Sequence, residues 1–154
     1  MIIAGQRVNN DIVTEIGKFA ILWNHFEHFY CNNKHSLAKN INIVADSIKI
    51  DEEKMNIFRE ALNNRMESRF ENTITYVSQG LHPTGSNKSS KENKLYMEKF
   101  INNDNNQNNI IGCLLVIGRI RNNMMHGLKD ISELNGQLEL FQSINGVLED
   151  LSKQ

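Results

Sequence analysis

The chain has 154 residues, of which 40% are hydrophobic and 23% are charged. That balance is typical of a globular protein, and the length predicts a single domain over residues 1–154. With 17 Lys and Arg against 18 Asp and Glu, the net charge of −1 excludes a protein that is basic over its whole surface. An enzyme that acts on one phosphodiester needs only a local cluster of positive charge, so that class stays open.

The cysteines and the apolar runs set the expected compartment. Cys31 and Cys113 are too few for a disulfide framework and do not form a Cys-x-x-Cys pair. The longest apolar run, residues 110–117, is far shorter than the roughly 20 residues that cross a bilayer. The first ten residues lack the basic start and the long apolar stretch of a signal peptide. We therefore expect a soluble, cytoplasmic protein that does not contact a membrane.

Apolar residues in the first half of the chain recur at three- or four-residue steps, which is the spacing of helices. One helix is predicted from about Asp11 to Tyr30, a shorter one over residues 37–48, and a long one from Asp51 to near Gly80. Asp51 is followed by two glutamates, which is the pattern of an N-cap and an acidic first turn. The apolar positions of the first helix are Ile12, Ile16, Phe19, Trp23, Phe26 and Tyr30.

The second half of the chain is predicted to be helical as well. Residues 80–91 contain two Gly, one Pro and three Ser, so we expect a flexible loop there. A short helix near Leu95, a central helix over about 106–125 and a last helix over about 136–151 follow. The central helix is apolar on nearly every face in its first half and should be the most buried. The sequence thus predicts an all-α bundle of four to six helices without a domain boundary.

The central helix becomes polar within one turn, over Arg119-Ile-Arg121-Asn-Asn-Met-Met-His126-Gly127. At about 100° per residue, Arg119, Asn122 and His126 share one face, whereas Arg121 lies about 140° around the axis from His126. Two interpretations stay open on spacing alone. The cations can cap the last carbonyls of a helix that stops at Gly127, or the segment can be a site with acid–base and anion-binding chemistry.

The run RNNMMHG, which begins at Arg121 and follows an apolar helix, resembles the Arg-x4–6-His motif of the HEPN superfamily. Asn122 matches the polar residue that usually follows the Arg, and the whole run is similar to those of small stand-alone bacterial HEPN domains. The aromatic and acidic segment from Trp23 to Glu27 is similar to the first helix of those domains. The resemblance covers the whole chain loosely and implies an HEPN-like helical bundle.

HEPN domains are commonly metal-independent endoribonucleases that act as dimers, with two motifs facing one another in a cleft. The resemblance therefore implies a toxin or defence enzyme that cleaves single-stranded RNA or tRNA to 2′,3′-cyclic phosphate ends, with no metal or other cofactor. His126 would transfer protons near neutral pH, and Arg121 would stabilise charge on the phosphate. Asn122 would orient the imidazole or donate to the phosphate. The partners implied are RNA, a second copy of the chain, and an antitoxin or regulatory protein.

Arg119, Glu27 and Asn123 are expected to support this site or to bind RNA. Both arginines satisfy the loose spacing: helix geometry favours Arg119, and the resemblance favours Arg121. We assign catalysis to Arg121, because the motif must lie where the helix ends and a dimer brings residues from two faces to one phosphate. Glu27 is either an ordinary carboxylate at the edge of the core or a partner of Arg121 or His126.

Three alternatives remain. The chain can be a non-catalytic HEPN-type module that binds RNA or protein, or a plain helical dimerisation protein. It can also bind zinc through His25, His28, Cys31 and His35, which have metal-ligand side chains. Three-residue steps drift by about 60° each along a helix, so these four side chains converge on one ion only if the helix ends among them. Histidines packed on an aromatic helix are the favoured interpretation, and no metal site is expected.

Overall fold

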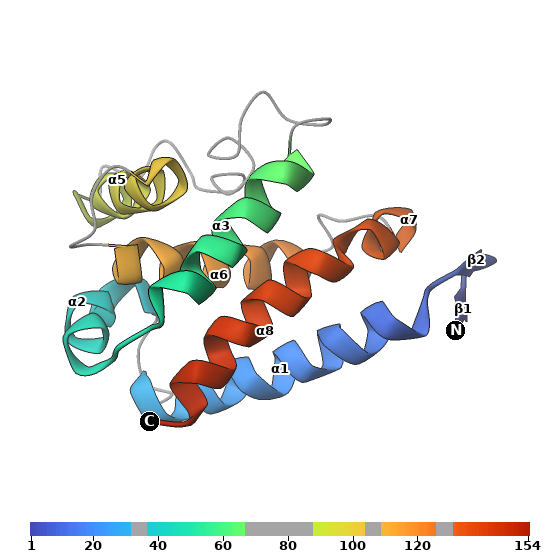
Figure 1. The fold of residues 1–154 in the computed structure, drawn as a ribbon, viewed down its shortest axis with the longest axis horizontal. Coiled ribbons are helices and arrows are strands. Elements are labelled where there is room, and N and C mark those ends of the chain that lie inside the picture. The colour runs from blue at the N-terminus through green and yellow to red at the C-terminus, as the bar shows by residue number, and fades with distance from the viewer. Residues whose placement is uncertain (32–36, 67–87, 104–108, 126–130) are drawn as a thin grey trace.

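The structure, a computed structural model, describes residues 1–31, 37–66, 88–103, 109–125 and 131–154. Helices dominate these ranges, and the strands among them form a single two-stranded hairpin at the N-terminus (Figure 1). The prediction of an all-α bundle is therefore confirmed. The helices are α1 (Asn10–Tyr30), α2 (Leu37–Ser47), α3 (Glu52–Met66), α5 (Lys88–Asn102), α6 (Asn109–Met125), α7 (Ile131–Leu134) and α8 (Leu138–Ser152).

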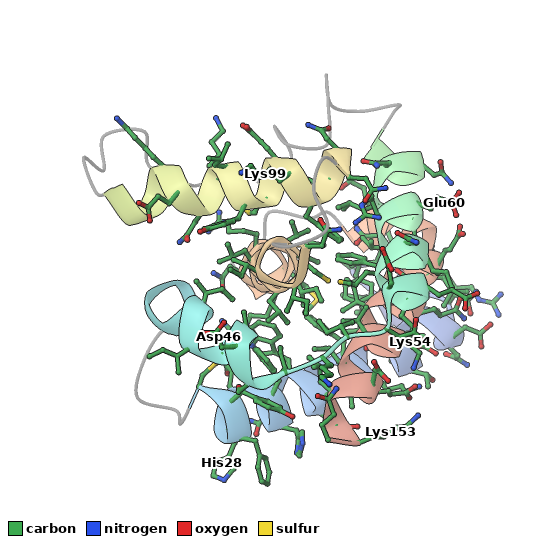
Figure 2. All side chains as sticks on the ribbon, turned by 60° about the vertical axis from the view of Figure 1, so that its left-hand side comes forward. His28, Asp46, Lys54, Glu60, Lys99 and Lys153 are labelled. Atoms are coloured by element: carbon green, nitrogen blue, oxygen red, sulfur yellow. The ribbon has the colours of Figure 1, made fainter. Side chains whose placement is uncertain are left out.

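Helix α6 lies in the middle of the bundle, as predicted. Figure 2 shows it end-on, with α5 on one side and the other long helices around it. Every residue from Cys113 to Ile117 is buried, so this stretch has no solvent-facing side. Gly112 allows α5 to approach closely, because an added Cβ would lie 2.3 Å from the Tyr96 carbonyl oxygen and 2.5 Å from Phe100 Cβ.

Helices α1 and α8 form the other main layer and run in the same direction (Figure 1). The buried Asn145 side chain of α8 donates from Nδ2 to the Glu15 carbonyl oxygen at 3.0 Å. Near the far end of the pair, the Tyr30 hydroxyl donates to the Leu151 carbonyl oxygen at 3.1 Å. Apolar burial supplies most of the stability of this layer, which includes the predicted stripe positions Ile12, Phe19, Trp23 and Phe26.

Two helix boundaries test the predicted loop and the predicted long helix. The Asp51 carboxylate accepts a hydrogen bond from the Glu53 amide at 2.8 Å, which confirms the predicted N-cap of α3. Described α3 ends at Met66, and the rest of the predicted helix, to Gly80, lies outside the described residues. Helix α5 begins at Lys88, so residues 88–91 are helical and not loop, a correction to the predicted 80–91 segment. Residues 80–87 lie outside the described part.

A hairpin of β1 (Ile2–Ile3) and β2 (Gln6–Arg7) precedes α1 and was not predicted. Its two turn residues have positive φ, 50° at Ala4 and 78° at Gly5, which is the conformation of a type I′ turn. The Asn135 side chain, in the 3₁₀ turn before α8, connects to it by donating to the Arg7 carbonyl oxygen at 2.9 Å. None of the described helices is long and apolar enough to cross a membrane.

Candidate functional site

All of the predicted site residues except Glu27 lie on the second half of α6 or follow it in the sequence. Arg119, Arg121 and Asn122 are described, and each is half-buried. Asn123 is also helical, but its side chain lies outside what the structure describes. His126 lies outside the described residues. The structure therefore places the cationic part of the predicted motif, and the role of His126 stays a prediction.

Arg121 and Asn122 are brought together directly. Arg121 Nη1 donates to Asn122 Oδ1 at 3.1 Å. In the described part of the chain this is the only hydrogen bond of the Arg121 guanidinium, which carries five N–H donors in total. Such a planar fork can grip two oxygens of a phosphate or carboxylate at once. Arg121 as a whole is partly exposed.

The contacts of Arg121 bear on the capping interpretation. A capping arginine bonds the last carbonyls of its helix, and the helix dipole acts mainly within the last turn. Arg121 lies four residues before Met125, the last residue of α6, and its bond goes to a side chain. No described contact of Arg121 is of the capping kind, but residues 126–130, which follow Met125, lie outside the described residues, so both interpretations stay open.

Arg119 has a different environment. Burial lowers the pKa of its guanidinium, but an arginine remains cationic at neutral pH. Two residues along a helix correspond to a rotation of about 200°, so Arg119 and Arg121 point to different sides of α6. One copy of α6 therefore does not bring both guanidinium groups to the same point.

Glu27 lies in the last turn of α1, away from the arginines. In Figure 1 the C-terminal end of α1 lies beside α2, whereas the C-terminal end of α6 points toward α7, at the other side of the bundle. Burial, and in addition the charge of Glu27, raise the pKa of the neighbouring Cys31 thiol to about 11. The structure thus brings Glu27 to Cys31 and does not bring it to Arg121.

The histidines of α1 are placed as aromatic neighbours. The rings of His25 and His28 pack against Phe29, with centroids 4.4 and 5.2 Å from its ring. Cys31 is buried, and His35 lies outside the described residues. Within the described ranges, no group of three or more His, Cys, Asp or Glu side chains is arranged to hold a metal ion.

Arg59 is a polar residue that the sequence did not single out. It is only 7% exposed, and its Nε donates to the Phe100 carbonyl oxygen at 2.5 Å. Its guanidinium lies over the Phe100 ring, 4.6 Å from the centroid. The partner is 41 residues away in the chain, so no local pattern announces the contact. The one signal is that Arg59 directly follows the aromatic residue Phe58 in the sequence.

In comparisons with known proteins, no protein-family model, no curated protein and no solved structure matches the chain. The chemistry of the site therefore rests on its own residues. At the end of α6 these provide two guanidinium groups on different sides of the helix and an amide bonded to one of them. Such a set can bind an oxyanion and stabilise added negative charge on it.

Proposed function

We propose that the protein is a metal-independent endoribonuclease of the HEPN type, acting in a toxin or defence system on single-stranded RNA or tRNA. The observation that carries this proposal is Arg121, a half-buried guanidinium whose one hydrogen bond in the described chain goes to Asn122. A cation held in this way, with N–H donors to spare, suits a phosphate that gains charge during a reaction.

The local charge supports the same substrate. Helix α6 contains Arg119 and Arg121 and no acidic residue, in a chain whose net charge is −1. The charged side chains that the second half of α6 itself contributes are therefore both positive, on a protein that is not basic overall. An enzyme that acts at one phosphodiester needs this local field and does not need a basic surface elsewhere.

In the proposed reaction the RNA supplies its own nucleophile. The 2′-oxygen attacks the phosphorus, the bond from phosphorus to the 5′-oxygen breaks, and a 2′,3′-cyclic phosphate and a 5′-hydroxyl result. A base takes the proton of the 2′-hydroxyl, and an acid gives a proton to the leaving 5′-oxygen; His126 has the side chain for either task. Arg121 holds two non-bridging oxygens as their charge grows, and Asn122 fixes the guanidinium through their hydrogen bond.

The proposal includes a two-fold dimer. Base and acid must act on opposite sides of the phosphorus, and one copy of the motif supplies a single histidine for both. A two-fold axis beside the end of α6 places the same patch of each chain against the other. An antitoxin or regulatory protein that covers this cleft would keep the enzyme inactive.

The test uses purified protein with tRNA and a single-stranded oligoribonucleotide in excess EDTA. We expect cleavage that survives chelation, cyclic phosphate ends, and no cut where a 2′-deoxy nucleotide replaces the one at the scissile bond. His126→Ala should lower the rate by on the order of 10²–10⁴. His28→Ala is the matched control, because Figure 2 places this side chain at the C-terminal end of α1, pointing away from the bundle. Light scattering of the same samples should give about twice 17.7 kDa.

Other outcomes separate the alternatives. Cleavage that stops in EDTA and returns with Mg²⁺ contradicts the mechanism. Tight RNA binding by a folded dimer with no cleavage of either substrate supports the non-catalytic module instead. A strict monomer that still cuts RNA contradicts the composite site, and a folded, fully active His126→Ala protein removes the assignment of that residue.

A further inference from the structure

A polar groove lies between α3 and the C-terminal end of α5. It has a volume of about 340 Å³, a size that suits a small ligand. Its lining is almost entirely amide and charged side chains, from Asn56, Arg59, Glu60, Asn63, Asn64 and Asn103. Nothing in the proposed ribonuclease mechanism uses these residues.

The buried member of the groove is Arg59. Its Nε donates to the Phe100 carbonyl oxygen and its Nη1 to Asn56 Oδ1, both at 2.5 Å. Its Nη2 is buried and has no hydrogen-bond acceptor in the described part of the chain. Over the same ranges, no carboxylate lies within ion-pair distance of the guanidinium.

The contacts of Arg59 offset only part of the cost of burying its charge. A buried charge is stabilised when it is paired and its donors are satisfied, and otherwise it is destabilising. The Phe100 ring and two neutral acceptors offset part of the desolvation of Arg59, and burial still lowers its pKa. The charge of Glu52 acts on Arg59 from beyond ion-pair distance, so the missing components are one acceptor for Nη2 and one negative charge in contact with the guanidinium. A single oxyanion supplies both.

We propose that this groove is a binding site for a small ligand with an oxyanion group, a phosphate or a carboxylate, that pairs with Arg59. The exposed amides of Asn64 and Asn103 then bond the rest of the ligand, since each offers donors and acceptors. Because Nη2 is buried in the structure, the side chains that cover it must move to admit the oxyanion. Glu60, also exposed on the rim, opposes the anion and limits its affinity.

The site is separate from the proposed catalytic one. Arg59 and Cys113 are close enough to influence each other's pKa, and Cys113 lies in the first half of α6. Arg121 lies two turns further along that helix. Binding in the groove can therefore be measured whether or not the protein cleaves RNA.

The experiment is calorimetric titration of the full chain with inorganic phosphate, adenosine monophosphate, acetate and adenosine. It is repeated in Arg121→Ala, so that anion binding by that guanidinium does not contribute. Asn64→Asp adds a charge to the rim and should weaken anion binding by about three- to tenfold, whereas Glu60→Gln should strengthen it by a similar factor. Asn24→Asp, the same change at an exposed position of α1, should have no effect. Comparing phosphate with acetate identifies which oxyanion the groove prefers.

The expected pattern is anion binding in both backgrounds that responds to Asn64→Asp and Glu60→Gln in opposite directions. Adenosine alone should not bind. Arg59→Met should abolish binding, with a thermal melt to show whether it folds, since Arg59 also holds the end of α5. The proposal is overturned if no anion binds in the Arg121→Ala background, or if folded rim variants leave the affinity unchanged.

Discussion

The first half of α6, from Asn109 to Ile117, and its second half, from Gly118 to Met125, belong to one helix but have different surroundings. In the first half, Cys113 through Ile117 are all buried, and Gly112 touches the backbone of α5. In the second half Ile120 is still buried, but Arg119, Arg121 and Asn122 are partly exposed. In the first half, packing limits which side chains fit. In the second half, the partly exposed positions hold side chains that can form hydrogen bonds.

The two halves of α6 differ in what their residues contribute: packing in the first half and the proposed site in the second. A residue chosen for packing cannot change size without moving its neighbours, because protein interiors are close-packed. A partly exposed arginine with a single hydrogen bond contributes little to folding, so its presence calls for another explanation. For Arg121 that explanation is the proposed binding and transformation of a phosphate. Changes to the packed residues of the first half should thus act on stability, and a change to Arg121 on activity.

The largest effect on stability should come from Gly112→Ala. The added Cβ would meet the Tyr96 carbonyl oxygen and Phe100 Cβ at distances that real contacts do not reach, so α5 must shift. We expect a loss of about 1–3 kcal/mol in the free energy of unfolding, measured by urea denaturation. Gly146→Ala on α8 is the matched control: nothing lies within 4 Å of its added Cβ, and a gain of about 0.5–1 kcal/mol is expected. Equal effects of the two changes would show that the packing of α5 on α6 is not tight.

A smaller effect is expected where charge holds α8 to α3. The Asp51 amide donates to Asp150 Oδ2 at 3.0 Å, and Lys54 lies 3.5 Å from Oδ1. The amide bond first, and then Lys54, lower the pKa of Asp150 below its ordinary value of 3.8. Its charged form therefore adds stability above that value, and the contribution disappears as the pH falls below it.

Asp150→Asn should thus lower the stability at pH 7 by less than about 1 kcal/mol. The gap between the two proteins should stay constant from pH 7 to about 4 and narrow as the pH falls below 3.8 in parallel urea titrations. Gly112→Ala provides the contrast, because its defect is steric and should persist through the same range. A gap for Asp150→Asn that widens in acid would contradict the assignment.

Periodicity in the sequence predicted the helices whose apolar faces are long enough to make a stripe. The stripe of α1 gave Phe19 and Phe26 as core residues, and Asp51 gave the start of α3. The start of α5 was missed because its first residues, Lys88 to Lys94, are polar and Leu95 is its first apolar residue. The N-terminal hairpin was missed because each strand has two residues, too few to show alternation.

The site shows the same division between local and distant information. Arg121 and Asn122 were selected from one short run of sequence, but the hydrogen bond between them was not predicted. Glu27 was left open as an ordinary carboxylate or a partner of Arg121 or His126, and the direction of α1 places it beside Cys31. Arg59 was missed because its role depends on a carbonyl of another helix. Contacts that depend on how helices pack are not encoded in the spacing of one helix.

The measurement that tests the central claim most directly is the steady-state cleavage of one oligoribonucleotide by Arg121→Ala and Arg119→Ala, with RNA affinity and unfolding measured on the same proteins. We predict that Arg121→Ala lowers kcat by on the order of 10²–10³ while RNA affinity stays nearly normal and stability changes by less than about 0.5 kcal/mol. Arg119→Ala should act mainly on RNA affinity and its salt dependence, or on folding. The opposite result, an inactive Arg119→Ala protein that binds RNA beside a nearly normal Arg121→Ala protein, would contradict the account.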